Sequence, residues 1–459
     1  MNRITEFSQL SLQPELLSNL KSLNFDRMTP IQALSLPAIL DGKDVIGQGR
    51  TGSGKTAAFG LGLLHRLDVS VWRVQSLVLC PTRELADQVA KSLRTLARSL
   101  HNIKILTLCG GAPIGPQIGS LAHGAHIIVG TPGRIEDHLR KGTLSLDHLG
   151  TLVLDEADRM LDMGFQNSLD AILAQIPSAR QTLLFSATYP TQIQQMAERV
   201  MTEPVMARVE SDEPAPAIDQ TFYRVRDDEE RLRVLLSILF SRQPESAIVF
   251  CRTKESTQTV ADGLKAAGFS ARVLNGDLEQ KQRDQVLVRF ANRSINVLVA
   301  TDVAARGIDI ESLDMVVNYH MALDAEVHLH RVGRTGRAGE QGTAFTLLSD
   351  REGHKLGELE RYLNTHLPES PLPEYRPTSV APPAMVTLQL DAGRKQKIRP
   401  GDILGALTGE QGIAGKDVGK IAIFEQQAFV AVARAAAKAA LNKLGEGKLK
   451  GRSVRVRRL

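Results

Sequence analysis

Short apolar runs alternate with segments of helical periodicity over most of this chain. Three of these runs have the length of a strand and no polar interruption: residues 76–80 (SLVLC), 151–154 (TLVL) and 182–185 (TLLF). Continuous apolar runs are typical of strands that are buried on both faces, and the amphipathic segments between them predict covering helices. The pattern therefore predicts a doubly wound α/β domain with a parallel sheet, in which ligands bind at the carboxyl ends of the strands.

Two proline-rich stretches interrupt the pattern, SDEPAPAID from residue 211 and LPESPLPEYRPTSVAPPA from residue 367. Between them the same strand pattern returns, at residues 247–250, 271–274, 296–300 and 315–317. Pro-rich segments of this kind are typical of linkers and spacers. We therefore predict an α/β domain at residues 1–210, a linker at 211–217, a second α/β domain at 218–366, a Pro-rich linker at 367–383 and a third domain at 384–459.

The third domain has another order of elements. MVTLQL favours a strand, the stretch after Pro400 a helix, GKIAIFEQQAFVAVA a hairpin, ARAAAKAALNKL a helix and RSVRVRRL a closing strand. The order β-α-β-β-α-β is typical of an α+β ferredoxin-like domain such as an RNA recognition motif. Residues 384–459 hold 15 Lys and Arg against 6 Asp and Glu, a net of +9, which leaves −4 on the rest of the chain. This asymmetry indicates a polyanionic partner, such as nucleic acid, for the third domain.

Composition narrows the class of protein. Of the 459 residues, 42% are hydrophobic and 23% are charged, which is ordinary for a globular protein. The three cysteines, Cys80, Cys109 and Cys251, form no CxxC motif, so we expect neither a disulfide framework nor a zinc site. The chain has no apolar stretch of about 18 residues and no apolar segment at its start, so we expect no membrane contact and a cytoplasmic location. A monomer is the default expectation.

A phosphate-binding loop is predicted at residues 49–56 (GRTGSGKT), which match GxxxxGK[ST] between an apolar stretch and a helical segment. The backbone N–H groups of Gly52, Ser53 and Gly54 can surround phosphate oxygens, and the helix start adds positive potential. Lys55 would place its charge on the β and γ phosphates, and the Thr56 hydroxyl would be a Mg²⁺ ligand. The loop therefore predicts a nucleoside triphosphate with Mg²⁺.

An acidic cluster, Asp155-Glu156-Ala157-Asp158, directly follows the apolar run at residues 151–154. Asp155 can hold Mg²⁺, largely through water, and Glu156 can orient or deprotonate an attacking water. Asp158 has no evident part in the chemistry and is a candidate for domain contacts. The acidic residues could instead cap the following helix, but the phosphate loop favours the catalytic interpretation.

Together these motifs resemble the DEAD-box RNA helicases. The resemblance extends over residues 7–365, in the family's order and spacing, through NFDRMTPIQ (24–32), PTRELA (81–86), GG (110–111), TPGR (131–134), SAT (186–188), VFC (249–251), QKQR (280–283), TDVAARGID (301–309) and HRVGRTGR (330–337). Two positions depart from the family's pattern: Gly49 replaces the usual alanine and Met28 a common proline. Neither departure affects a predicted catalytic residue.

The resemblance implies that two RecA-like domains close on ATP and single-stranded RNA. The catalytic residues it implies are Lys55, Asp155 and Glu156 from the first domain, with Arg334 and Arg337 from the second as arginine fingers. Arginine fingers contribute a factor of roughly 10³–10⁵ in rate. The other nucleotide contacts it implies are Gln32 and Phe25 on the adenine and Asp309 on the ribose.

The same resemblance implies an RNA site across both domains, at Pro81, Thr82, Arg83, Gly111, Thr131, Gly133, Arg134, Thr301 and Asp302. Most of these residues are small and polar, which favours contacts to sugar and phosphate over contacts to bases. It also implies that Ser186 and Thr188 couple the nucleotide state to domain closure.

The whole arrangement, with the stretch RPGDILGALTGEQGIAGKDVGKIAI, is similar to the DbpA subfamily of these helicases. In that subfamily the tail binds a hairpin of 23S ribosomal RNA, and the role is assembly of the large ribosomal subunit. The predicted first strand of this tail has no aromatic residue, and the third has only Phe429, so base stacking on the sheet is weakened. We therefore expect RNA at basic edges and loops: Arg394, Lys395, Lys397, Arg399, Lys416, Lys420 and residues 448–458.

Two alternatives stay open. A nucleotide-gated RNA clamp would keep the same residues without processive unwinding. A general RNA-remodelling or RNA-decay helicase would use the tail only as a basic arm, although such arms are usually of low complexity and this tail has a folded pattern.

Overall fold

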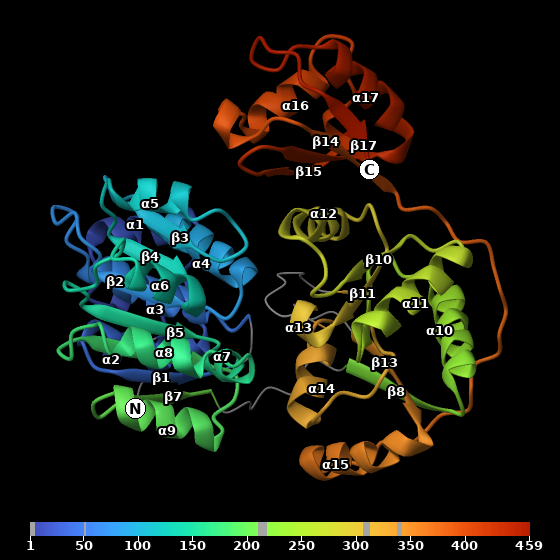
Figure 1. Ribbon diagram of the computed structural model, residues 1–459, viewed down its shortest axis with the longest axis horizontal. Coiled ribbons are helices and arrows are strands. Elements are labelled where there is room, and N and C mark those ends of the chain that lie inside the picture. The colour runs from blue at the N-terminus through green and yellow to red at the C-terminus, as the bar shows by residue number, and fades with distance from the viewer. Residues whose placement is uncertain (1–4, 50–51, 210–217, 306–312, 337–341) are drawn as a thin grey trace. The chain divides into compact units, whose positions relative to one another are not determined.

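The computed structural model describes residues 5–49, 52–209, 218–305, 313–336 and 342–459 (Figure 1). The chain divides into two compact units, whose described residues lie within 5–209 and within 218–459. The predicted linker at 211–217 and the predicted site residues Asp309 and Arg337 lie outside the described residues. Within the described residues, no helix is long and apolar enough to cross a membrane.

The first unit is built on a seven-stranded parallel sheet of order β3-β4-β2-β5-β6-β1-β7. Its strands are β1 (Val45–Gln48), β2 (Ser76–Leu79), β3 (Ile105–Leu108), β4 (Ile127–Gly130), β5 (Thr151–Asp155), β6 (Gln181–Ser186) and β7 (Val205–Arg208). Every residue of β2, β5 and β6 is buried. This burial explains their continuous apolar sequence, because helices cover both faces of the sheet.

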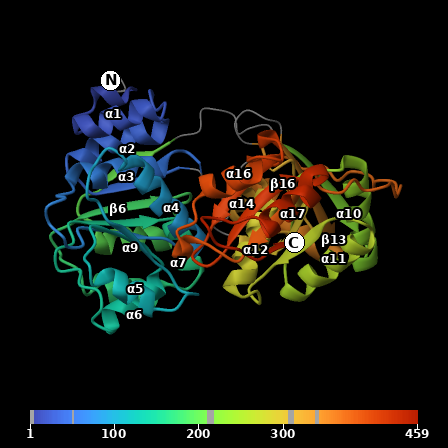
Figure 2. The same ribbon diagram turned by 90° about the horizontal axis from the view of Figure 1, so that it is seen from above.

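One helical layer packs on each face of this sheet, as seen for α2, α3 and α9 around β6 in Figure 2. The first layer comprises α1 (Pro14–Ser22), α2 (Pro30–Leu40), α3 (Lys55–Arg66) and α4 (Arg83–Leu96). The second comprises α6 (Pro132–Arg140), α7 (Ala157–Asp162), α8 (Gln166–Leu173) and α9 (Thr191–Val200). The short elements η1 (Phe7–Gln9) and α5 (Gly115–Leu121) complete this unit.

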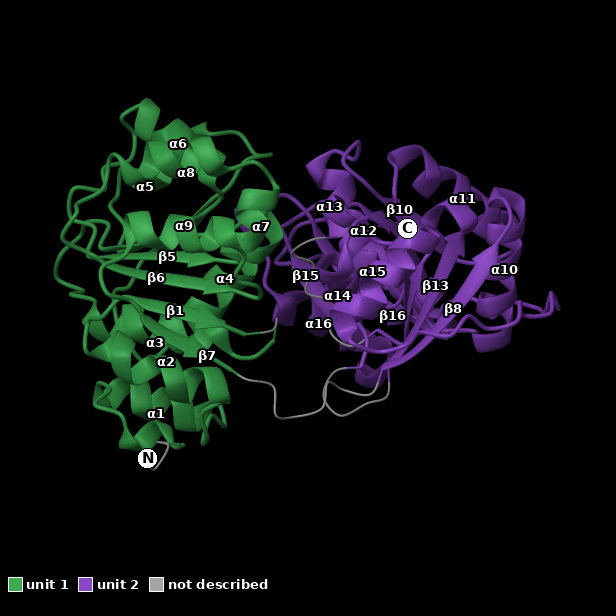
Figure 3. Ribbon diagram, turned by 90° about the horizontal axis from the view of Figure 1, so that it is seen from below, with its two compact units in different colours: residues 1–212, 307–309 green, residues 213–306, 310–459 purple. Residues whose placement is uncertain are grey.

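The second unit (Figure 3) contains a six-stranded parallel sheet of order β10-β11-β9-β12-β13-β8. Its strands are β8 (Ile218–Val225), β9 (Ala247–Cys251), β10 (Ala271–Leu274), β11 (Val297–Thr301), β12 (Met315–Asn318) and β13 (Gly342–Ser349). Its helices are α10 (Asp228–Arg242), α11 (Lys254–Ala266), α12 (Gln280–Ala291), α13 (Asp302–Ala305), α14 (Ala325–Val332), η2 (Asp350–Glu352) and α15 (Gly353–Leu363). The second doubly wound parallel-sheet domain predicted from the sequence is thereby confirmed.

The same unit ends in a four-stranded antiparallel sheet of order β15-β16-β14-β17. Its elements are β14 (Met385–Leu390), η3 (Arg394–Gln396), α16 (Pro400–Thr408), η4 (Gly415–Asp417), β15 (Val418–Ile423), β16 (Ala428–Ala433), η5 (Arg434–Ala436), α17 (Ala437–Glu446) and β17 (Val456–Arg458). With the first strand between the third and the fourth, this is the predicted ferredoxin-like order. Alternate residues Val386, Leu388 and Leu390 face a core shared with α16 and α17, which lie together on one side of the sheet (Figure 1).

The opposite face of that sheet is buried against α12 and the turn that follows it. Asn292 Nδ2 donates to Thr387 Oγ1 (2.9 Å), Thr387 Oγ1 donates to Ser294 Oγ (2.7 Å), and Gln285 Nε2 donates to Gln389 Oε1 (3.2 Å). Phe429 pairs with Gln389 on the same face and is fully buried. Residues of the third domain therefore pack on the second α/β domain through the sheet face that carries its strand aromatic residue.

The three cysteines are free and buried. Burial raises the pKa of both Cys109 and Cys251 to about 12. They therefore act as small apolar side chains in the cores of the two units.

Candidate functional site: a nucleotide and RNA surface

The phosphate loop lies between β1 and α3, which begins at Lys55. Gly52 and Gly54 have φ of 82° and 94°, in the left-handed region that favours glycine. A Cβ on Gly54 would lie 2.5 Å from Gln32 Nε2, so a larger residue cannot occupy this position without displacing that side chain. Lys55 Nζ donates to Gly49 O (2.7 Å), which holds the ammonium group over the loop.

The predicted adenine-reading segment contacts this loop. Gln32 Oε1 accepts from Thr29 N (2.8 Å), and its Nε2 donates to Gly54 O (3.1 Å). The amide thus uses one acceptor site and one N–H to connect α2 with the phosphate loop, and keeps one of each for a ligand. The Phe25 ring is partly exposed and packs edge-on against Phe7, with the centroids 6.4 Å apart.

The acidic cluster lies at the carboxyl end of β5. Glu156 has φ 52°, and this left-handed residue turns the chain from β5 into α7. Asp155 is buried, and its Oδ1 accepts from Glu156 N (3.0 Å). Burial raises the pKa of the Asp155 carboxyl to about 7, opposed by the positive charge of Lys55. A bound cation would favour the charged form of this carboxylate, so Asp155 is suited to bind one.

Glu156 has a partner that the sequence analysis missed. Arg159 Nη1 donates to Glu156 Oε2 at 3.1 Å, and the two side chains are only 5% and 9% exposed. Spacing of three residues at the start of a helix could have suggested this pair. The acidic character of the cluster favours metal binding when only the sequence is considered.

Asp158 also has a partner that was not predicted. Its Oδ2 accepts from Thr188 N (3.0 Å) and Thr188 Oγ1 (2.9 Å). Although burial opposes it, hydrogen bonding by Thr188 holds the pKa of Asp158 below its usual value. The acidic cluster after β5 is thus joined to the SAT segment after β6, where the predicted coupling residues Ser186 and Thr188 lie.

The RNA candidates of the first unit follow the carboxyl ends of β2, β3 and β4. Pro81, Thr82 and Arg83 lead from β2 into α4, whose N-cap is Thr82, accepting from Leu85 N (3.3 Å). Thr131, Gly133 and Arg134 lie at the start of α6, and Arg134 Nη2 donates to Ala112 O (2.9 Å), one residue after Gly111. The structure therefore gathers these candidates at one edge of the sheet, as the parallel topology requires.

In the second unit, Thr301 ends β11 and Asp302 begins α13. The Asp302 carboxylate accepts two hydrogen bonds from buried Arg331, at 2.6 and 2.7 Å. Arg331 also donates to Asn318 Oδ1 (3.1 Å) and His320 O (2.8 Å). Asp302 therefore anchors the HRVGRTGR segment to the end of β11. Arg334, the described member of the predicted finger pair, is buried after α14.

The basic candidates of the third domain are exposed. Lys450 connects two of its loops, because its Nζ donates to Lys397 O (2.6 Å) and forms an ion pair with Asp402 (3.0 Å). We call the surface formed by these loops the basic end; it comprises Arg394, Lys395, Lys397, Arg399, Lys448, Lys450 and Arg452. Lys416 and Lys420 are exposed elsewhere, in η4 and β15.

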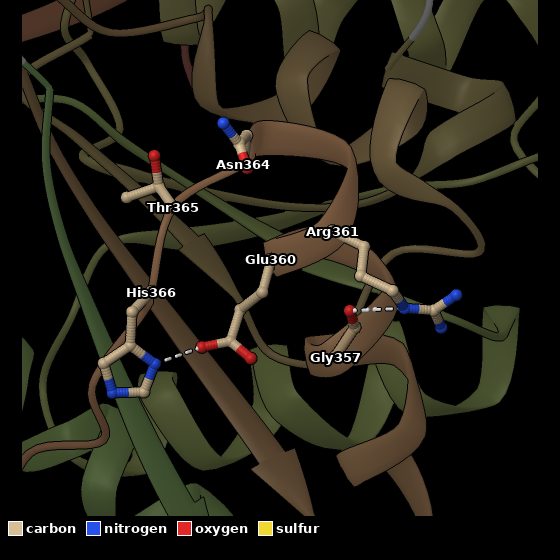
Figure 4. Close-up of a pocket in the computed structure, with 6 residues that line it drawn as sticks. All are labelled: Gly357, Glu360, Arg361, Asn364, Thr365 and His366. Atoms are coloured by element: carbon tan, nitrogen blue, oxygen red, sulfur yellow. Dashed lines mark hydrogen bonds and ion pairs between the residues drawn. The ribbon is translucent and has the colours of Figure 1, made fainter.

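A pocket of about 400 Å³ lies at the end of α15 and contains none of the predicted site residues (Figure 4). Glu360 accepts there from His366 Nδ1 (2.6 Å) and from Leu367 N (2.8 Å), and Arg361 Nε donates to Gly357 O (3.2 Å). These bonds connect the last turn of the helix with the chain that leaves it, so Glu360, Arg361 and His366 have structural partners.

Two parallel-sheet domains with a phosphate loop and an acidic pair at a strand end define the ATP-hydrolysing core of a helicase. The family models match this chain at residues 29–196 (DEAD/DEAH box helicase), 230–339 (helicase conserved C-terminal domain) and 387–458 (DbpA RNA binding domain). The chain therefore belongs to the DEAD-box ATP-dependent RNA helicases and carries an RNA-binding domain of the DbpA type.

Individual proteins agree with this assignment. The chain is 52% identical over 457 residues to the ATP-dependent RNA helicase DbpA of Escherichia coli, covering 99% of this chain and 100% of that one. It is 44% identical over 358 residues to the DEAD-box helicase CshA of Geobacillus kaustophilus, covering 78% and 76%. Among solved structures, Saccharomyces cerevisiae Dbp5 L327V bound to RNA and ADP BeF3 is similar, with a TM-score of 0.73, 30% identity and coverage of 81% and 97%.

Proposed function

We propose that this RNA helicase unwinds short RNA duplexes in 23S ribosomal RNA during assembly of the large ribosomal subunit, in the cytoplasm, with its third domain choosing the RNA. The observation that carries the proposal is the buried sheet face of that domain together with its exposed basic end. The sheet face that could stack on bases is buried, so a folded RNA would contact the loops of this domain, which has a net charge of +9. The near full-length similarity to the E. coli ATP-dependent RNA helicase DbpA supports the helicase activity in this proposal.

The hydrolytic roles follow from the first unit. The phosphate loop and Lys55 would bind the triphosphate. Glu156 would release its hydrogen bond to Arg159 and then orient the attacking water. Arg334 and Arg337 would neutralise charge that develops on the γ-phosphate, while Phe25, Gln32 and Asp309 bind the nucleoside.

Magnesium fits the oxygen donors at this place. Asp155 is a buried carboxylate whose described hydrogen bond comes from its own chain neighbour, and Thr56 lies in the first turn of α3. Within the described ranges, no three His, Cys, Asp or Glu side chains gather into a metal site, so the remaining ligands would be water and phosphate, as Mg²⁺ prefers. The bound cation would supply charge that neutralises the phosphates.

The RNA roles follow from the strand ends. Backbone amides and small polar groups after β2, β4 and β11 suit the sugar–phosphate backbone, which carries no sequence information. Ser186, Thr188 and Asp158 would couple nucleotide state to closure. Under this proposal the core supplies unwinding, and Arg394, Lys395, Lys397, Lys416 and Lys420 of the third domain supply the choice of RNA.

The test compares ATP hydrolysis and duplex release with a 23S rRNA fragment and with random RNA of equal length. We expect the ribosomal fragment to stimulate both activities more strongly. Glu156→Gln should bind ATP and RNA but lose about 10²–10⁴-fold in turnover, because a positioned general base contributes about this factor. Near-native turnover of this variant would show that Glu156 is not the base.

Two other outcomes would redirect the proposal. Equal stimulation by both RNAs would indicate a general RNA-remodelling or RNA-decay helicase. ATP-dependent RNA binding without duplex release would indicate a nucleotide-gated clamp.

A further inference from the structure

Arg272 and Arg289 of the second α/β domain have no described carboxylate partner. Carboxylates pair there with Arg224, Arg226, Arg231, Arg233, Arg252, Arg293 and Arg331. Arg272, in β10, donates only to Ala271 O (2.9 Å) in the described structure. Arg289, in α12, has no described side-chain hydrogen bond, and its Nε is buried without a partner.

Helix α12 contacts strand β10, so Arg289 and Arg272 lie on adjoining elements, close enough for their guanidinium charges to interact. Burial lowers the pKa of Arg289 to about 10, and the neighbouring charge of Arg272 lowers it further in the same direction. No carboxylate contributes to that shift. Two neighbouring positive charges in a partly buried position favour binding of an anion. A bound anion would reduce the repulsion between the two guanidinium groups and offset the cost of burying the charge of Arg289.

The position of Arg289 relates this pair to the third domain. Gln285, Arg289 and Asn292 are spaced four and three residues apart, so they share one face of α12. Gln285 and Asn292 hydrogen-bond to Gln389 and Thr387 of β14. Arg289 therefore lies along the line where the third domain packs on α12.

The basic end begins just beyond this line. Gln389 lies one residue before the end of β14, and Arg394 follows five residues later. On the helix, Arg289 is about 6 Å along the axis from Gln285. Arg457 of β17 pairs with Gln389 on the other side, which adds a further cation beside β14. Cations of the third domain thus lie at the same end of β14 as Gln389, which hydrogen-bonds to α12.

We propose that Arg272 and Arg289 form a phosphate-binding site for the RNA backbone on the second α/β domain, beside the packed third domain. An RNA held at the basic end passes this site, and its backbone phosphate accepts hydrogen bonds from the two guanidinium groups, which suit phosphate geometry. The site is independent of base sequence. It goes beyond the proposed function, because it requires RNA binding but not a preference for ribosomal RNA.

The test measures the affinity of the full-length protein for RNA over a range of KCl concentrations. Each phosphate contact contributes about 0.7–0.9 to the slope of log K against log salt. We expect Arg272→Gln/Arg289→Gln to weaken binding and to reduce the magnitude of this slope by about 1. The reduction should be equal with a 23S rRNA fragment and with random RNA of the same length.

Two control variants separate charge from folding and from domain packing. Arg293→Gln removes a neighbouring arginine that pairs with Glu245, and Asn292→Ala removes a bond to Thr387 without changing charge. Both should keep the parent slope, and thermal unfolding should show that all variants are folded. A parent-like slope in the double variant, or the same loss in Asn292→Ala, would overturn the site. A lost preference for ribosomal RNA in the parent protein would contradict only the proposed function.

Discussion

The Glu156–Arg159 pair is the least expected feature of the hydrolytic centre. The pair is buried, so its two charges depend on each other, and Arg159 occupies the Glu156 carboxylate that we propose orients the attacking water. Removal of one partner from a buried pair leaves an uncompensated charge, at a cost of about 3–5 kcal/mol. Arg159 therefore connects the stability of the first unit with the state of the proposed base.

We expect Arg159→Ala to lower the free energy of unfolding of the first unit by about 3–5 kcal/mol. Trp72 is the chain's single tryptophan and lies in this unit, so its fluorescence during urea unfolding reports on that unit. Arg140→Ala is the matched control, because Arg140 pairs with Asp137 while 74% exposed and should change stability by less than about 1 kcal/mol. Equal effects in both variants would show that burial of the pair is unimportant.

The bonds of Thr188 to Asp158 predict a separation of hydrolysis from unwinding. Thr188→Val keeps the shape of the side chain and removes the hydroxyl that donates to Asp158. We expect RNA-stimulated ATP hydrolysis to persist while duplexes released per ATP hydrolysed decrease several-fold. Thr95→Val, at an exposed threonine of α4, should leave this ratio unchanged. If Thr188→Val released as many duplexes per ATP hydrolysed as the parent, the SAT segment would not couple hydrolysis to unwinding.

Within β1, one glycine permits the packing of the neighbouring strand. A Cβ on Gly47 would lie 2.3 Å from Phe185 Cε1, and Phe185 packs on Phe59 with the ring centroids 5.4 Å apart. Since β1 leads directly into the phosphate loop, any shift of β1 reaches the nucleotide site.

We expect Gly47→Ala to destabilise the first unit by about 1–3 kcal/mol, as overpacking of a core does, and to raise KM for ATP. Trp72 fluorescence in urea and steady-state ATPase assays measure the two effects. Gly119→Ala is the control, because its Cβ would meet nothing within 4 Å on exposed α5. That change should be neutral or stabilising by about 0.5–1 kcal/mol.

A histidine buried between helix α14 and strand β8 leads us to expect that the stability of the second unit decreases at acid pH. His328 is buried, its Nε2 lies 2.9 Å from Gln220 Oε1, and burial and Arg331 lower its pKa from 6.5 to about 4. Between these two values the unfolded chain binds a proton that the folded chain does not. Stability is therefore complete above pH 6.5 and falls as the pH decreases towards 4.

We expect His328→Gln to flatten this dependence by up to about 1.4 kcal/mol per pH unit. Hydrogen exchange of β8 and β13 peptides from pH 7 to pH 5 measures it. His320, whose pKa burial also lowers to about 4, should maintain part of the slope in the variant. His366→Gln, at an exposed position, is the control. An unchanged slope in His328→Gln would contradict the assignment.

Over the whole molecule, the net positive charge is concentrated in the third domain. The remainder carries a net of −4, so we expect its RNA affinity to depend on a limited set of backbone contacts. The basic domain should bind RNA first and then raise the effective concentration of nearby duplexes to roughly millimolar for a short linker. Its packing on α12 leaves the basic end exposed for this purpose.

We expect a chain that ends near Pro371 to hydrolyse ATP weakly and without preference among RNAs. The full-length variant Lys395→Glu/Lys397→Glu should lose the same preference, because charge reversal affects the basic end and not the buried sheet face. RNA-stimulated ATPase assays with ribosomal and random RNA measure both. A preference for ribosomal RNA that survived in both proteins would place specificity in the core.

Much of this protein could be predicted from local sequence. Residues 76–80, 151–154 and 182–185 specified strands because a two-sided buried strand must be apolar throughout. Strand polarity then brought the phosphate loop and Asp155 to one edge, because parallel strands end together. The ferredoxin-like order and the charge of the tail were equally readable, since each depends on composition or on the order of elements along the chain.

Only the tertiary structure decided which polar groups form hydrogen bonds with each other. Asp158 and Thr188 are 30 residues apart, Gln32 and Gly54 are 22 apart, Asp302 and Arg331 are 29 apart, and Asn292 and Thr387 are 95 apart. Each has other polar neighbours that it could bind. A hydrogen bond forms only within a few tenths of an ångström and a narrow range of angles. Those positions are set by the packing of whole helices and strands, which no local pattern contains.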